Sequence, residues 1–350
     1  MTLEEFLNQR NPEEYDFKDL MIGYYEHYKE KHEDDARYQK VIEHAESTKN
    51  TQDDMRKWIL YKTDPYSGRA FDCDNSNLTC PLTEEIYHTL WGWEKDESGT
   101  KNFRRAVWFP FPDSNAEFGG DTVNTLATTI LKYTKKRSVK LLAELSTDKL
   151  SERGIEDGIW ENWERFAKLT SSIGNFTLVP AGFNWYRNSK TEDYWDLSLR
   201  LLVDAVLPAD IIWNKKYYKQ YINAFFLWDY MKGDQPTPLF KSHKPLLNGD
   251  EWGHNYRIMF PQSTDDYAEF LKSVNSRIQR RGMFMVAMLR IATKYKDDYK
   301  KIMEYLCKPE TTISNCENAC EQLSGMLELS DAAKKLISET KKTIEISQKQ

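Results

Sequence analysis

Several polar side chains that could bind a ligand stand close together in the middle of the chain. Asn175, Asn184 and Arg187 are separated by only a few residues, and Asp196 follows them. The planar guanidinium of Arg187 could bind a phosphate or carboxylate through two parallel hydrogen bonds. Asp196 could hold Arg187 in place or act as a general acid or base. We therefore interpret Asn175, Asn184 and Arg187 as candidate ligand-binding residues and Asp196 as a candidate catalytic residue.

Two more candidate catalytic residues precede this stretch. Asp121 follows two glycines, and His88 belongs to a predicted helix that also carries Tyr87 and Trp91. A histidine that titrates near neutral pH and a carboxylate are the usual partners in proton transfer. If His88, Asp121 and Arg187 meet at an open concave pocket, an enzyme is favoured. If they are scattered and each is bound to backbone, a non-catalytic binding protein is favoured. For the central stretch, the alternative to a polar pocket is a structural corner, in which Asn side chains hold loop backbone and the acids cap a helix.

The elements expected to position these residues follow from turn formers and periodicity. Gly174 and Asn175 predict a sharp turn, and the β-prone residues 176–179 predict a strand that ends at Pro180. A second turn at 181–184 leads to a polar loop that carries Arg187. Thr191 is then expected to cap a helix whose apolar stripe is Trp195, Leu199, Leu202 and Val206.

The flanking regions are predicted to be largely helical. Residues 119–122 predict a tight turn into a helix capped by Asp121, and the apolar spacing in 264–294 predicts a long helix. Further helices are expected at 297–307, 311–327 and 331–348. The predicted fold is mainly α with a few short β-strands and a single main helical core. We expect a main domain at 1–295, containing the central turn region, and a C-terminal helical appendage at 296–350.

Composition limits the classes of protein and partner. The net charge of −6 argues against coating nucleic acid by charge alone, and 40% hydrophobic residues suffice for a sizeable core. No apolar run approaches the ~20 residues that span a bilayer, so we expect no membrane partner. An odd number of cysteines, five, favours a reduced cytoplasm. Because neither Cys73/Cys80 nor Cys316/Cys320 is a CxxC pair, we predict no metal site, and the sequence identifies no cofactor.

Several motifs in order resemble a family of uncharacterised bacterial proteins. They are Tyr87-His88 with Leu90-Trp91, Gly119-Gly120-Asp121-Thr122, Ser172-Ile173-Gly174-Asn175-Phe176 and Asp193-Tyr194-Trp195-Asp196-Leu197. The resemblance covers about residues 64 to 290. Tyr194 stands where the family has an arginine. The family has no established activity, so the resemblance implies a common core region and no particular reaction.

The segment IGNFTLVPAGFN is also similar to part of the His-Asn-His-like nuclease domain of modification-dependent restriction enzymes. That domain implies an upstream histidine base and a metal. The nearest upstream histidine here is His88, which lacks the expected His-x-x-Pro setting. Other nucleic-acid features are an Arg37/His44 spacing seen in one class of ribonucleases and two short basic clusters, 132–140 and 277–281. Such clusters could contact a phosphate backbone or could be solvated helix faces.

Two hypotheses for function follow. The first is an effector that acts on a nucleotide, nucleic acid or other phosphate-bearing ligand, in a bacterial conflict or phage-defence setting. The second is a non-catalytic binding protein whose aromatic helices recognise a protein partner. Its aromatic residues repeat in steps of four at Trp213, Tyr217, Tyr221 and Phe225.

Overall fold

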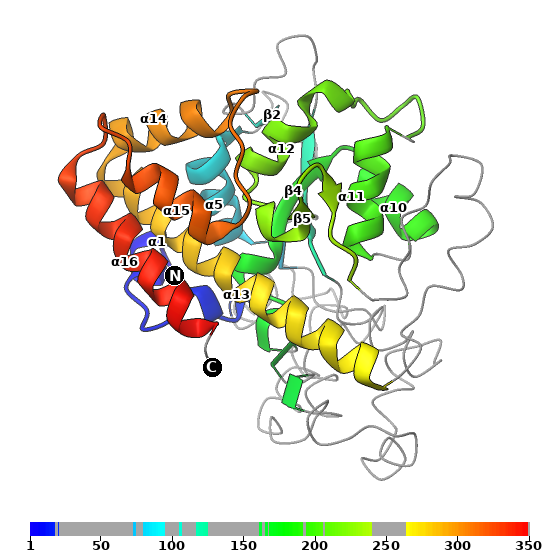
Figure 1. Cartoon of the computed structure of the whole chain (residues 1–350), viewed down its shortest axis with the longest axis horizontal. Helices are drawn as coiled ribbons and strands as arrows, with labels where there is room; N and C mark the ends of the chain where they lie inside the picture. The colour runs from blue at the N-terminus through cyan, green and yellow to red at the C-terminus, as the bar shows by residue number, and fades with distance from the viewer. Residues whose placement is uncertain are drawn as a thin grey trace, which may run out of the picture.

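The computed structural model describes residues 1–17, 20, 73–74, 80–94, 105–106, 117–124, 161–162, 165–166, 168–191, 194–205, 207–239 and 264–348 (Figure 1). The Arg37/His44 pair, the basic cluster 132–140, Val206 and Asp193 lie outside the described residues.

The protein is mainly α-helical with a few short strands, as predicted. The helices are α1 (Leu3–Leu7), α5 (Pro81–Trp91), α10 (Phe183–Thr191), α11 (Trp195–Asp204), α12 (Tyr218–Ala224), α13 (Thr264–Lys294), α14 (Lys296–Leu306), α15 (Cys316–Ser324) and α16 (Asp331–Ser347). Single 3-10 turns occur at η1 (Pro12–Glu14), η2 (Ile173–Asn175), η3 (Lys215–Tyr217) and η4 (Trp228–Tyr230). None of the described helices combines the length and apolar composition needed to cross a bilayer.

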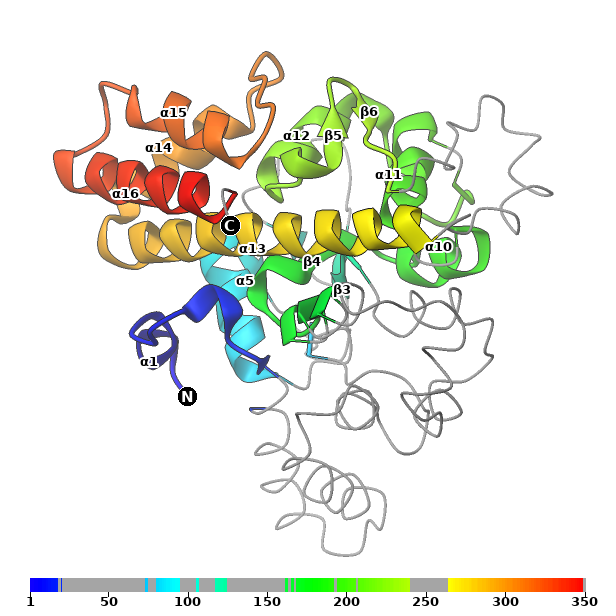
Figure 2. The same ribbon diagram turned by 60° about the horizontal axis from the view of Figure 1, so that its bottom comes forward.

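Helix α13 contacts α5, α14, α15, α16 and three of the 3-10 turns, and its predicted bounds are confirmed. It crosses the molecule, with α14, α15 and α16 on one side and α5 and α1 on the other (Figure 2). Its inward positions are apolar at helical spacing, and Val274, Ile278 and Met285 are completely buried. At 31 residues and about 1.5 Å per residue, the helix is about 46 Å long. One element can therefore contact both the first and the last segments of the chain.

Three two-stranded antiparallel sheets accompany the described helices. Strands β1 (Trp93–Glu94) and β2 (Arg105–Ala106) pair, as do β5 (Met231–Lys232) and β6 (Gln235–Pro236). The largest sheet pairs β3 (Phe118–Thr122) with β4 (Phe176–Pro180). Strand β4 confirms the prediction for 176–180. The prediction of a turn at 119–122 is wrong, because the two glycines lie in β3, where they are buried.

The turn at Ile173–Asn175 exists, but Gly174 is required for a reason other than positive φ. A Cβ atom on Gly174 would lie 2.0 Å from the backbone oxygen of Ile278 and 2.8 Å from the backbone nitrogen of Gly282. The η2 turn therefore lies directly against the backbone of α13. Gly182, by contrast, has φ +80° in the second predicted turn, where a glycine is favoured.

We expect Gly174→Ala to lower the free energy of unfolding by about 3 kcal/mol, because two backbone segments must separate to admit the methyl group. Gly325→Ala is the matched control, since a Cβ there meets nothing closer than 3.5 Å. Urea unfolding followed by circular dichroism would give both values. Equal midpoints for the two variants would contradict the close contact between η2 and α13.

The C-terminal helices share one continuous hydrophobic core with the rest of the described protein. Two have caps that the sequence encodes: Asn315 accepts a hydrogen bond from the backbone of Asn318, and Ser330 accepts one from that of Ala333. Helix α16 contacts both α13 and α15, and its Ala333, Ile337 and Ile344 are buried. The domain boundary at 295 remains a prediction.

All five cysteines are free and buried. Burial raises the pKa of the Cys307 and Cys320 thiols to about 12, so little thiolate exists at neutral pH. We expect a chromogenic disulfide reagent to titrate all five thiols in denaturant and to react only slowly with the native protein. Rapid native reaction of even one cysteine would contradict this burial.

Candidate functional site

Asp121 and Arg187 meet in a buried ion pair. Asp121 lies in β3 opposite Thr177 of β4, and Arg187 comes from α10, not from the loop that we predicted. Arg187 Nη2 lies 2.9 Å from Asp121 Oδ1, and Arg187 Nε lies 2.8 Å from Oδ2. Their side chains are 1% and 3% exposed, respectively. Two of the predicted site residues therefore converge, and they bind each other.

The Arg187 guanidinium also contacts Thr122 and Trp195. Nη2 donates to the backbone oxygen of Thr122 at 2.9 Å, and the guanidinium carbon lies 5.3 Å from the ring centroid of Trp195. An anion could bind Arg187 only by displacing Asp121, which would leave a buried carboxylate unpaired. In this arrangement the pair joins the β3–β4 sheet to α10 and α11. The ligand-binding role of Arg187 and the catalytic role of Asp121 stay predictions.

The side chain of Asn175 forms hydrogen bonds with the backbone of two segments, one after β3 and one before η2. It is completely buried, and its Nδ2 donates to the backbone oxygens of Asn124 at 2.9 Å and Thr170 at 2.8 Å. Its Oδ1 accepts the backbone N–H of Asn124 at 2.9 Å. The Asn124 side chain in turn donates to the hydroxyl of Tyr230 at 3.3 Å. Asn175 therefore ties the end of β3 to η2, and it connects through Asn124 to η4.

Asp196 lies in the first turn of α11 and is 5% exposed. Its Oδ1 accepts the backbone N–H of Leu197 at 2.9 Å, and its Oδ2 accepts that of Leu239 at 2.8 Å. Arg200, on the same helix, forms its ion pair with Asp204. The prediction that Thr191 caps this helix is wrong. Thr191 is the last residue of α10, where its hydroxyl donates to the Arg187 carbonyl, and α11 begins after Tyr194.

The other two candidate site residues, Asn184 and His88, have no described contact with the Asp121–Arg187 ion pair. Asn184 is half-buried in the first turn of α10, and His88 is exposed in the last turn of α5. A histidine at a helix C-terminus is favourable to the helix dipole without any catalytic role. No contact of His88 with Asp121 or Arg187 is present among the described residues.

The basic cluster 277–281 is not a solvated helix face. Arg277 is 8% exposed and Arg281 is completely buried. Arg280 forms an ion pair with Asp229 at 3.1 Å. Arg281 donates to four backbone oxygens, those of Gly174, Phe176, Phe225 and Phe226. A sequence signal existed, because Arg277 and Arg281 are four residues apart and flank the buried Ile278 in an apolar helix.

Within the basic cluster 277–281, Arg277 is the residue that the structure singles out as a functional candidate. Its guanidinium carbon lies 5.5 Å from the ring centroid of Tyr230, and within the described parts of the chain its buried Nη1 has no hydrogen-bond partner. Burial lowers the pKa of Arg277, while Tyr230, Asp229 and Asp196 act in the opposite direction. A buried donor without a partner is costly in a native protein, and a bound ligand or water is one explanation.

Among the described residues, no group of three or more His, Cys, Asp or Glu side chains is placed to hold a metal ion. No family model, no curated protein and no solved structure matches the chain.

Proposed function

We propose that the protein binds a phosphate-bearing ligand, such as a nucleotide or nucleic acid, with Arg277 as the anion contact. The observation that carries this proposal is the buried Nη1 of Arg277 without a hydrogen-bond partner in the described structure. A guanidinium stays charged at neutral pH and matches the oxygens of a phosphate. A phosphate oxygen would supply the missing acceptor and offset part of the cost of burying the charge.

The carboxylates near Arg277 already have other partners, which favours an external anion. Asp196 accepts two backbone N–H groups, and Asp229 pairs with Arg280. This part of α13 carries three arginines, at positions 277, 280 and 281. They outnumber the two aspartates, so the local electrostatic field favours a bound anion. Tyr230 supplies an aromatic face against the guanidinium and could in the same way accompany a base or sugar.

The wider setting of this proposal is a bacterial effector in conflict or phage defence, and its support is the nuclease-like segment 173–184. A reducing cytoplasm is part of the proposal because all five thiols are free. The second hypothesis, recognition through aromatic helices, receives less support. Tyr217, Tyr221 and Phe225 lie in the core, and Trp213 packs against Tyr221.

Isothermal titration calorimetry with orthophosphate, mono- and trinucleotides and short oligonucleotides tests the proposal. We expect at least one of these ligands to bind the wild type, and Arg277→Met to weaken that binding by 2 kcal/mol or more, about thirtyfold. Lys272→Met is the control, because it removes one positive charge from an exposed position of the same helix. Equal binding by the wild type and a folded Arg277→Met, or binding by neither, would overturn the proposal.

A further inference from the structure

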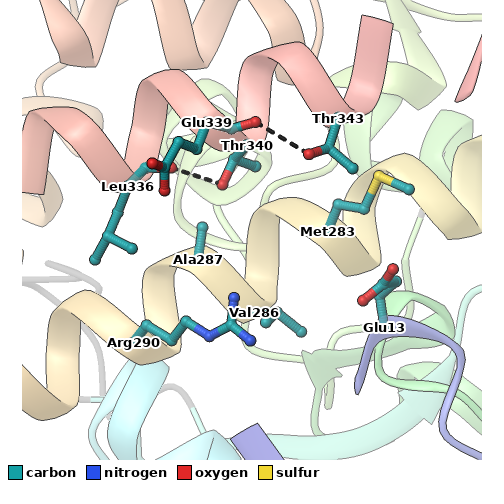
Figure 3. A pocket seen from close by; sticks show the side chains of 9 residues that line it. All are labelled: Glu13, Met283, Val286, Ala287, Arg290, Leu336, Glu339, Thr340 and Thr343. Atoms are coloured by element: carbon teal, nitrogen blue, oxygen red, sulfur yellow. Dashed lines mark hydrogen bonds between the residues drawn. The ribbon is translucent and has the colours of Figure 1, made fainter. Parts of the chain in front are cut away.

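A cavity lies between the N-terminal turn η1, helix α13 and helix α16, and Arg277 is not among the residues that line it. Its volume is about 230 Å³. Figure 3 shows Glu339 on α16 and Glu13 on different sides of it, with Ala287 and Met283 on α13. The lining residues are Glu13, Met283, Val286, Ala287, Arg290, Leu336, Glu339, Thr340 and Thr343.

The polar groups of this cavity are mostly hydrogen-bond acceptors. The hydroxyls of Thr340 and Thr343 donate to the helix carbonyls of Leu336 and Glu339 at 2.9 and 3.0 Å. Because each hydroxyl has a single proton, their oxygens can only accept a bond from a ligand. Two carboxylates add further acceptors, so a ligand must bring donors.

Arg290 supplies the one guanidinium of the lining, and one of its nitrogens already donates to a backbone oxygen. Arg290 Nη2 donates to the backbone oxygen of Leu7 at 3.0 Å. The lining holds two carboxylates and one guanidinium, and Lys335 lies 4.0 Å from Glu339 at the exposed edge of the cavity. Burial raises the pKa of the Glu13 carboxyl, so its anion lacks part of the solvation that a ligand cation would replace. Because the lining offers mainly acceptors, a ligand that brings N–H donors fits it better than phosphate does.

The remaining wall is aliphatic and the space is small. Met283, Val286, Ala287 and Leu336 can cover methylene groups, and Met283 and Ala287 are largely buried. The volume is below the ~300–1,000 Å³ typical of pockets for drug-sized ligands. A short aliphatic chain fits these two constraints better than an aromatic ring system or a sugar.

We propose that this cavity binds a small aliphatic ammonium compound, such as a short diamine or a lysine-like amino acid. The ammonium group donates to Glu13 or Glu339 and to the threonine oxygens, and the methylene chain lies against Ala287 and Met283. A ligand that also carries a carboxylate places it at Arg290. The site is independent of the phosphate-bearing ligand proposed for Arg277.

Ligand-observed NMR and calorimetry on the full chain test this assignment with 1,4-diaminobutane and lysine. Butane-1,4-diol is the uncharged control of similar shape. We expect the ammonium compounds to bind and the diol to bind at least about tenfold more weakly, because charged hydrogen bonds exceed neutral ones in strength. Equal binding of the diol, or binding by neither ammonium compound, would overturn the proposal.

Two variants place the binding at this cavity. Glu339→Gln should weaken the diamine about tenfold, and Ala287→Leu should abolish binding by filling the space. Glu304→Gln is the matched control, because Glu304 is also an exposed glutamate with a lysine four residues away, at 3.9 Å, on a helix that does not line the cavity. Circular dichroism confirms that each variant folds. Unchanged affinity in folded Ala287→Leu would show that the ligand binds elsewhere and would refute the assignment.

Discussion

Arg281→Met is expected to cost about 5 kcal/mol of unfolding free energy, enough to leave little folded protein. The Arg281 guanidinium is completely buried and donates to the carbonyls of Gly174, Phe176, Phe225 and Phe226. Methionine has a similar length but no donor, so these buried oxygens would lose their partners. Each unsatisfied buried group costs about 1–3 kcal/mol.

Arg281→Lys separates charge from geometry. An ammonium keeps the positive charge but cannot reach four oxygens in the plane of a guanidinium, so we expect an intermediate loss. Yield in the soluble fraction and the urea midpoint give the order wild type, lysine, methionine. A methionine variant as stable as the wild type would mean that these carbonyls have other partners.

Breaking the ion pair between Asp121 and Arg187 should have the second largest effect. Asp121→Asn leaves a buried guanidinium without its counter-charge, which costs about 3–5 kcal/mol. Adding Arg187→Met removes that charge, so the double variant should be more stable than the sum of the single losses predicts. The expected coupling is about 2 kcal/mol or more.

The exposed pair Lys300 and Glu304 provides the control cycle. Its atoms are 3.9 Å apart and both side chains are about 60% exposed. Solvent screens such a pair, so its coupling should stay below about 1 kcal/mol. If the buried and the exposed pairs gave equal coupling energies by urea unfolding, Asp121 and Arg187 would not be packed as described.

The elements predicted well were those with strong local signals. Helix α13 has a long apolar period, and α16 (Asp331–Ser347) is preceded by Ser330, a good capping residue. Strand β4 is β-prone and stops at Pro180. In each case the information lies within the segment itself, so no distant residue had to be known.

The errors arose where a distant partner decides the structure. Gly119 and Gly120 suggested a turn, but pairing with β4, more than fifty positions later, makes them a strand. The polar residues around Arg187 suggested a loop, but Asp121 neutralises the arginine and allows it to be buried in α10. For the candidate site, the sequence identified some of the residues that meet but not how they are arranged. Asp121 and Arg187 meet, whereas His88 faces solvent.

The long-range hydrogen bonds of Arg281 can form only late in biosynthesis, because their acceptors are made long before the arginine. Its partner carbonyl in Gly174 lies 107 positions earlier in the chain. At about 5–20 residues per second, that carbonyl leaves the peptidyl-transferase centre roughly 5–20 s before the arginine does. Until α13 is translated, the carbonyls of Gly174 and Phe176 lack the guanidinium that donates to them, so this part of the core is completed late in synthesis.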